Sequence, residues 1–213
     1  MICGVDEAGR GPVIGPMVVA GVCAGEGMME SLGVRDSKKL TPRRREYFAE
    51  RIREVAKQVV VKVITPEEID RMRESMTLNE IEIEIFASII SLLEGDVVYV
   101  DAADVNEERF AREIEARVQR EVKIISKHKA DVLFPIVSAA SIIAKVERDR
   151  IIKEIAEEIG DFGSGYPADE RTKEFLERYY DEHGELPPHT RHSWKSAKRL
   201  VKRKGQKNLG DYS

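Results

Sequence analysis

Residues 1–16 read MICGVDEAGRGPVIGP, and the organisation of the chain can be worked out from this stretch. An apolar run, 2–5, ends in two carboxylates, Asp6 and Glu7, and a glycine-flanked arginine, Gly9-Arg10-Gly11, follows at once. An apolar run of this length is typical of a buried strand. Glycines allow another backbone to approach closely. We therefore expect a strand that ends at a functional edge and a corner that contacts a ligand.

The rest of the chain alternates between strand-like and helix-like patterns. Apolar runs predict strands over 2–5, 13–23, 59–64, 96–100 and 122–126. Helical periodicity and capping residues predict helices over 41–56, a short one from Pro66, then 77–93, 106–121, 130–159 and 169–182. This order predicts an α/β fold, a five-stranded mixed sheet flanked by helices, with a helical C-terminal extension. We expect a catalytic domain over 1–160, a helical substrate-binding region over 161–205 and a flexible tail over 206–213.

Several carboxylates are expected to meet at one end of this sheet. If the strands that end at Asp6 and Asp101 are parallel neighbours, both side chains emerge at the carboxyl edge, where open α/β sheets bind ligands. Glu7 joins them only if the strand breaks or bulges, because successive strand residues point to opposite faces. Asp131 begins a predicted helix and is the third candidate, although a helix N-cap is its simpler interpretation.

Clustered carboxylates need a positive partner. Two of them about 4 Å apart repel by roughly 4 kcal/mol at an effective dielectric constant near 20. An all-oxygen ligand set without His or Cys favours Mg²⁺ or Mn²⁺, and two such ions are the usual apparatus for hydrolysis of a phosphodiester. A buried lysine is the competing counterion. Proton transfer between paired carboxylates, as in a glycosidase, is the other catalytic reading.

Charge is distributed unevenly along the chain. The net charge is −4, yet the segment 186–210 has no acidic residue and carries eight basic ones, Arg191, Lys195, Lys198, Arg199, Lys202, Arg203, Lys204 and Lys207. That segment therefore carries +8 and the remainder −12, which suits a phosphate backbone or, equally, a solvated helix face. Charged residues reach 35% of the chain, and Asn and Gln number three each, as in thermophile proteins.

Two further features bound the class of protein. No apolar stretch approaches the roughly 20 residues of a membrane span, and strand-like sequence begins at Ile2, so we expect a soluble, cytoplasmic protein without a signal peptide. Cys3 and Cys23 lie in apolar runs without His or Cys at metal-ligand spacing. We expect them to be small buried apolar residues, with a bridge between them left open.

Six segments stand in an order that resembles a known family. They are VDEAGRGPVIGP, RDSKKLTPRRRE, YVDAADVN, HKADVLFPIVSAASIIAKVERDR, GSGYP and PPHTRHSW, and together they resemble ribonuclease HII, the type 2 ribonuclease H, in its archaeal form. The resemblance spans nearly the whole chain and implies a ribonuclease H-like fold. It also implies that the metal-binding catalytic set is Asp6, Glu7, Asp101 and Asp131, holding two Mg²⁺ or Mn²⁺ ions.

The same resemblance implies how the substrate is recognised. Gly9, Arg10, Gly11 and Tyr166 would read the 2′-hydroxyl of a ribonucleotide in an RNA/DNA hybrid or in ribonucleotide-containing DNA, and Lys38 would contact a phosphate. Without the family, Tyr166 reads as a half-buried aromatic residue and the segment around Lys38 as a polar turn. The implied activity is endonucleolytic cleavage on the 5′ side of the ribonucleotide, by a protein that we expect to be monomeric.

Other classes of protein fit fewer of these features. A non-catalytic nucleic-acid adaptor would explain the basic segment but would have no use for four carboxylates. An actin-like phosphotransferase should show two glycine-rich phosphate loops in related halves, and the sequence shows neither. A glycosidase would leave the basic segment without a role.

The extreme C-terminus, QKNLGDYS, raises a separate possibility. Gln206, Leu209 and Tyr212 have the spacing of the short peptide with which replication proteins dock to the sliding clamp, PCNA. Ser213 stands where a second aromatic residue is usual, so binding should be weak. A disordered polar terminus is the alternative.

Overall fold

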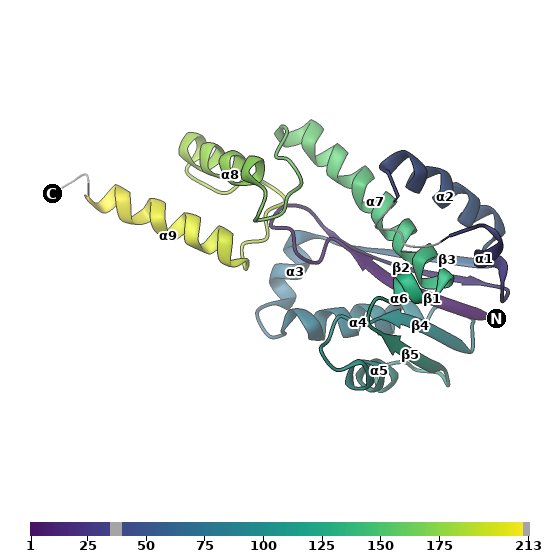
Figure 1. Cartoon of the computed structure of the whole chain (residues 1–213). Coiled ribbons are helices and arrows are strands. Elements are labelled where there is room, and N and C mark those ends of the chain that lie inside the picture. The colour runs from purple at the N-terminus through teal and green to yellow at the C-terminus, as the bar shows by residue number, and fades with distance from the viewer. Residues whose placement is uncertain (35–39, 211–213) are drawn as a thin grey trace. The chain divides into compact units, whose positions relative to one another are not determined.

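A five-stranded mixed sheet organises the protein (Figure 1). The structure is a computed structural model that describes residues 1–34 and 40–210, with side chains as far as Gly205. The strand order is β3-β2-β1-β4-β5, with β1 antiparallel to β2 and parallel to β4, and β4 parallel to β5. The strands are β1 (Ile2–Ala8), β2 (Met17–Ala24), β3 (Gln58–Ile64), β4 (Val97–Asp101) and β5 (Lys123–Lys127). The predicted mixed sheet is confirmed.

The chain divides into two compact units. Within the described residues, the first comprises 1–8, 18–63 and 76–149, and the second 9–17, 64–75 and 150–210. The first unit contains most of the sheet and the helices α1 (Met28–Ser31), α2 (Pro42–Val55), α4 (Leu78–Ile90), α5 (Glu107–Glu115), α6 (Ala130–Leu133) and the first part of α7 (Pro135–Ile159). The second contains the rest of α7 with α3 (Pro66–Met72), α8 (Glu170–His183) and α9 (Lys195–Gly210).

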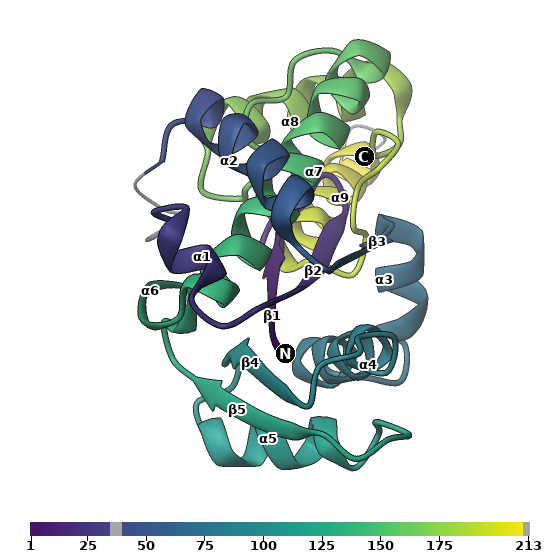
Figure 2. The ribbon, with the colours of Figure 1, turned by 90° about the vertical axis from the view of Figure 1, so that its right-hand side faces the viewer.

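Helices cover both faces of the sheet in the first unit (Figure 2). A β-carbon placed on Gly4 would lie 2.4 Å from the carbonyl oxygen of Ile136 in α7. One placed on Gly21 would lie 2.8 Å from the side chain of Ile89 in α4. Gly4 and Gly21 belong to neighbouring strands and face opposite sides, since Gly21 pairs with Val5. Glycine at these positions therefore lets α7 and α4 pack closely on the sheet.

The second unit has its own apolar core. It is formed by the buried side chains of Val13, Ile14, Ile155, Phe162, Phe175, Leu176, Leu186, Ala197 and Leu200. Two of these residues come from a segment that we predicted to be part of the strand 13–23. The strand begins only at Met17, because Gly15 has a φ of 94° and Pro16 has no N–H for a sheet ladder. Val13 and Ile14 pack in the apolar core of the second unit instead of in the strand.

Two predicted helices also differ from the structure. The helix expected over 130–159 is divided into α6 and α7, and Phe134 between them is extended, with φ −123° and ψ 111°. Steric conflict with the ring of Pro135 disfavours a helical conformation for the residue before it. The helix expected over 106–121 ends at Glu115.

Cys3 and Cys23 lie directly opposite each other on β1 and β2 and form a disulfide, with a Cα–Cα distance of 4.0 Å. Both side chains are fully buried. The alternative that the sequence left open, a bridge, is therefore the one in the structure.

Within the described residues, no helix is long and apolar enough to cross a membrane.

Candidate active site

Three carboxylates converge in the first unit. Each of Asp6, Asp101 and Asp131 offers an oxygen, and these oxygens lie within 4.8 Å of one another. Asp6 is on β1 and Asp101 ends the parallel neighbour β4, so both reach the same edge of the sheet. The N–H of Ala130 donates a hydrogen bond of 3.1 Å to Oδ1 of Asp101, which ties the start of α6 to the end of β4.

Asp131 is not a helix cap. The N-cap of α6 is Lys129, in the left-handed conformation with φ 56°, and Asp131 lies in the first turn. Asp131 is only 1% exposed. The simpler interpretation of Asp131 as an N-cap is therefore wrong, and the carboxylate is placed in the cluster.

Burial makes this cluster electrostatically costly. Asp6 is 5% exposed, and its burial, together with the charge of Asp101, raises its pKa to about 7. Hydrogen bonds from Ser141 and from the N–H of Glu7, and the charge of Lys145, act in the opposite direction on that pKa. A divalent cation would remove the repulsion, and an all-carboxylate set is the kind that hard cations prefer. The residues present therefore fit Mg²⁺ or Mn²⁺.

A lysine and a serine from α7 belong to this environment and were not singled out from the sequence. Nζ of Lys145 donates a 2.8 Å hydrogen bond to Oγ of Ser141, four residues earlier on the same helix. The segment SIIAK carries this spacing, which places both side chains on one helical face. We considered a buried lysine as the counterion that competes with a metal ion. A lysine is present beside the metal-binding geometry, but Lys145 is half-buried.

Glu7 is not among the three converging carboxylates. Strand β1 continues to Ala8, and Glu7 keeps its place in the ladder opposite Val19. The break or bulge that would turn Glu7 to the side of Asp6 is therefore not observed. Its role in the catalytic set stays a prediction.

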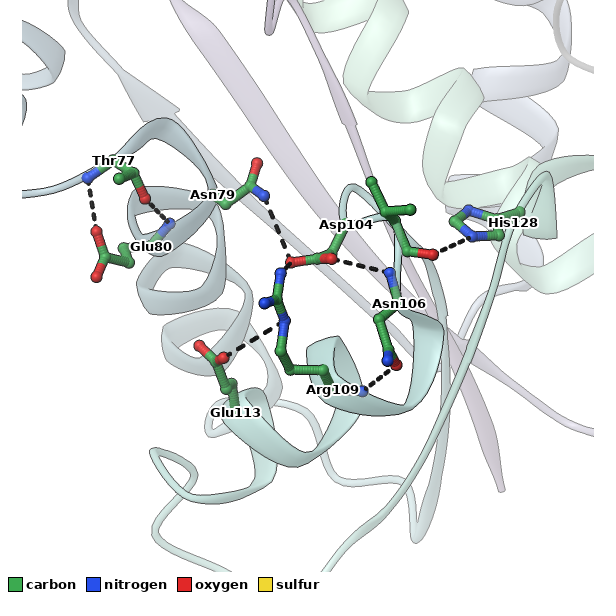
Figure 3. Close-up of polar contacts among 9 residues, drawn as sticks. Thr77, Asn79, Glu80, Asp104, Asn106, Arg109, Glu113 and His128 are labelled. Carbon is green, nitrogen blue, oxygen red and sulfur yellow. Dashed lines mark hydrogen bonds and ion pairs between the residues drawn. The ribbon is translucent and has the colours of Figure 1, made fainter.

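The loop after β4 is held by a second acidic residue, Asp104 (Figure 3). Its carboxylate accepts hydrogen bonds from the N–H of Asn106 at 2.9 Å, from the side chain of Asn79 at 3.4 Å, and from the guanidinium of Arg109. The Asn106 N–H, and then Arg109, hold the pKa of Asp104 below its usual value. Asp104 therefore stays charged and fixes the chain three residues after Asp101.

The second unit brings together the Gly-Arg-Gly corner and Tyr166. Gly9 has a φ of 81°, which favours glycine. A β-carbon on Gly11 would lie 3.4 Å from Cε1 of Tyr166, so the ring lies beside the corner. The carbonyl of Gly165 accepts hydrogen bonds from the N–H groups of Val13 and Ile14, at 2.7 and 3.2 Å, and joins the two loops. Tyr166 remains 41% exposed.

The basic segment separates into residues with different surroundings. Arg191 is fully buried. Arg203 forms an ion pair of 2.7 Å with Glu177 of α8, and Lys204 pairs with Asp181 of the same helix. The exposed basic residues in the first two turns of α9 are Lys195, Lys198, Arg199 and Lys202. Their spacing, i, i+3, i+4 and i+7, places them on one face of the helix.

The other predicted site residues lie beyond these observations. Lys38 and Tyr212 lie outside the described residues. Gln206 and Leu209 belong to the backbone of α9, which continues to Gly210, and the described side chains end before them.

Comparison with known proteins identifies the family. A family model described as Ribonuclease HII matches residues 3–197. The chain is 53% identical over 207 residues to the ribonuclease HII of Thermococcus kodakarensis, a match that covers 95% of this chain and 90% of that protein.

Solved structures agree with this result. The crystal structure of the ribonuclease H2 from Pyrococcus horikoshii superposes with a TM-score of 0.90 at 44% identity, covering 95% of this chain and 97% of the other. The structure of the PCNA:RNase HII complex from Archaeoglobus fulgidus gives a TM-score of 0.87 at 46% identity, covering 94% and 96%. This chain therefore belongs to the ribonuclease HII family of metal-dependent endonucleases.

Proposed function

We propose that this protein hydrolyses the phosphodiester on the 5′ side of a ribonucleotide, in RNA/DNA hybrids or in DNA that contains single ribonucleotides. The products would carry 3′-hydroxyl and 5′-phosphate ends. The observation that carries the proposal is the convergence of Asp6, Asp101 and Asp131 in a chain of this family. The glycosidase and adaptor readings have no corresponding support.

Two Mg²⁺ or Mn²⁺ ions are the proposed cofactors, held by Asp6, Glu7, Asp101 and Asp131. When bound, such ions would supply the Lewis acidity that lowers the pKa of an attacking water and balances charge on the leaving oxygen. Asp6 must lose its proton before it can act as a ligand, since its pKa is raised to about 7. Lys145 favours that deprotonated form, because its charge lowers the pKa of Asp6.

Selection of the sugar is assigned to Gly9, Arg10, Gly11 and Tyr166. The 2′-hydroxyl is the group that distinguishes RNA from DNA at a given sugar, and backbone groups at a glycine corner can approach it without reading the base. The contact between Gly11 and the Tyr166 ring supports a shared role for the two loops. Lys38 is proposed to contact a substrate phosphate.

Duplex binding is assigned to the region 161–205, and within it to the basic face of α9 formed by Lys195, Lys198, Arg199 and Lys202. These side chains are exposed on one side of the helix, whereas Arg203 and Lys204 are paired with acidic residues of α8. Contacts of this kind bind phosphates and position the duplex without reading its sequence.

Cleavage assays on matched duplexes test the proposal. One duplex contains a single ribonucleotide, a second has 2′-deoxyribose at that position, and a third has 2′-O-methylribose, each with and without Mg²⁺. We expect cutting of the first duplex alone, at its 5′ side, and only with the ion. Tyr166→Ala should weaken discrimination between the first two more than it weakens duplex affinity. Equal cutting of an all-DNA duplex would refute the proposal.

A second role, docking to a sliding clamp, is favoured by the solved PCNA complex of the Archaeoglobus fulgidus relative. We propose that Gln206, Leu209 and Tyr212 form the contact in this chain. Calorimetry against the cognate clamp, with the full chain and with a chain lacking 206–213, tests it. We expect weak binding by the full chain, since ordering of the tail opposes association. Indistinguishable binding by the two forms would assign the contact elsewhere.

A further inference from the structure

Arg191 is a fully buried arginine whose side chain is directed at the Gly-Arg-Gly corner, within the same compact unit. Its three nitrogens donate hydrogen bonds to three backbone carbonyls of one loop. Nη2 binds the carbonyl of Gly9 at 2.6 Å, Nη1 that of Arg10 at 2.9 Å, and Nε that of Gly15 at 2.9 Å. The guanidinium is planar and its donors point in fixed directions. It therefore fixes the backbone of the loop 9–15 at both ends.

Trp194 completes this arrangement from the following turn. Its indole Nε1 donates a 3.0 Å hydrogen bond to the carbonyl of Gly11. The guanidinium carbon of Arg191 lies 4.7 Å from the centroid of the indole ring, in cation–π contact. The consecutive carbonyls of Gly9, Arg10 and Gly11 thus all point to one pair of side chains.

The orientation of these carbonyls determines where the N–H groups of the loop point. All described peptide bonds are trans, so each N–H points opposite to the carbonyl that precedes it. The N–H groups of Arg10 and Gly11 are therefore directed away from Arg191. The residue after Gly11 is Pro12, which has no N–H. Arg191 and Trp194 therefore orient the corner so that two successive N–H groups, those of Arg10 and Gly11, point away from the two side chains.

The backbone of Arg191 is itself anchored. Its N–H donates to the carbonyl of Val13 at 2.8 Å. The carboxylate of Asp70 accepts hydrogen bonds from the next two backbone N–H groups, those of His192 at 2.6 Å and Ser193 at 2.9 Å. The backbone that carries the guanidinium is therefore held in place, as a positioning residue requires.

We propose that Arg191, with Trp194, is a positioning residue for ribose recognition, which holds the Gly9–Gly11 peptides in the orientation that reads the 2′-hydroxyl. This inference rests on the proposed function, which assigns that reading to the corner. Arg191 acts through the loop carbonyls and has no contact with the substrate. Its charge is used for orientation, in contrast to the exposed basic residues of α9.

The conservative variant Arg191→Lys tests this role, because lysine keeps the charge but lacks the planar fork. Binding is measured in the full chain without divalent ions, so that no cutting occurs, on a duplex with one ribonucleotide and on its all-DNA counterpart. We expect the ratio of the two affinities to fall roughly tenfold, since hydrogen bonds from a charged donor are lost, while affinity for the all-DNA duplex changes by less than about twofold.

Arg178→Lys is the matched control. Arg178 is an exposed arginine of the same unit, and its guanidinium carbon lies 5.7 Å from the ring centroid of Phe175. It should keep the wild-type ratio. Trp194→Phe keeps an aromatic ring under Arg191 but removes the donor to Gly11, and it should lower the ratio by a smaller factor. This second variant also decides the matter if Arg191→Lys fails to fold.

The emission of Trp194, the only tryptophan of the chain, reports on the same contacts. We expect Arg191→Lys to shift this emission to longer wavelength and to increase its quenching by acrylamide. Suppose that the wild type discriminates between the duplexes, but that the ratio is unchanged in folded Arg191→Lys and in Trp194→Phe. This outcome would overturn the positioning role of Arg191 and leave the proposed function standing. A wild type without discrimination would overturn the proposed function, and the positioning role with it.

Discussion

Asp6 is the buried carboxylate on which the pH behaviour of the metal-free protein should depend. Its pKa is raised from 3.8 to about 7, first by burial and then by Asp101. Between these two values the folded state binds a proton that the unfolded state releases. The contribution of Asp6 to stability is therefore fully present below about pH 4 and is lost as the pH rises through about 7.

We expect Asp6→Asn to stabilise the metal-free protein at pH 8. The amide does not ionise, so the cost of a buried charge is removed, and at about 1.4 kcal/mol per pKa unit the gain should be at least ~1 kcal/mol. Urea unfolding in EDTA at pH 4 and pH 8 measures it, and the difference between wild type and variant should be largest at pH 8. A gain of the same size at both values would contradict the assignment.

Asp101→Asn should keep the fold and lose most of the cleavage activity. An amide is a poor ligand for a hard cation and removes a charge that the ions require. Circular dichroism checks the fold, and cleavage of the single-ribonucleotide duplex in Mg²⁺ measures the loss. Activity within about threefold of wild type would remove Asp101 from the site.

The acidic residues of the site could be predicted from the sequence to a large extent, and Arg191 could not. Asp6 and Asp101 end apolar runs, and this pattern already indicates one edge of a sheet. Asp131 needed the family resemblance, because a residue near a helix start usually has a local role. Arg191 was counted as one of eight basic residues, since nothing in charge or spacing separates a buried arginine from an exposed one. Its partners are carbonyls roughly 180 residues away in sequence.

Helix α9 is the element on which duplex affinity should depend. Replacing Lys195, Lys198, Arg199 and Lys202 with alanine should flatten the dependence of log affinity on log salt by roughly 3 to 4, since each neutralised phosphate contributes about 0.9 to the slope. Titrations of the duplex at several salt concentrations measure the slope. Arg203→Ala with Lys204→Ala is the control, and it should change the slope less, because both residues are paired with α8. An unchanged slope in the fourfold variant would assign duplex binding elsewhere.

Most elements could be predicted because their signals are local. Thr77 and Glu80 form a capping box, with the N–H of Thr77 bound by Glu80 at 2.6 Å and the N–H of Glu80 bound by Thr77 at 3.3 Å (Figure 3). Such a pattern marks the start of α4 in the sequence itself. The start of β2 was missed because Val13 and Ile14 are apolar enough for a strand, but they pack in the second unit. That choice depends on long-range packing and has no local signal.

For the molecule as a whole, the Cys3–Cys23 bridge should contribute measurably to stability. It closes a loop with a sequence separation of 20, and in the chain-entropy model a loop of this size is worth about 3 kcal/mol. We expect a reductant to lower the Tm of the wild type and to leave that of Cys3→Ala/Cys23→Ala unchanged. Calorimetry with and without dithiothreitol measures the change in Tm. An equal change in the two proteins would show that the bridge does not stabilise the fold.

The division of the chain into two units was not evident from its order in sequence. We predicted consecutive regions, 1–160, 161–205 and 206–213, because composition and style of sequence change after Gly160. These boundaries stay a prediction. The second unit takes in 9–17 and 64–75 as well as 150–210 of the described chain, and no change of composition marks those two short segments.

This interleaving limits what recombination can do with the gene. A fragment that begins at residue 150 would lack Val13 and Ile14, two members of its own apolar core, and the carbonyls to which Arg191 donates. It would therefore be an incomplete unit, and it could not be transferred to another protein as a working form of the proposed substrate-binding region. Point substitutions within the continuous gene, by contrast, can alter the proposed ribose recognition while the core and the contacts of Arg191 stay in one chain.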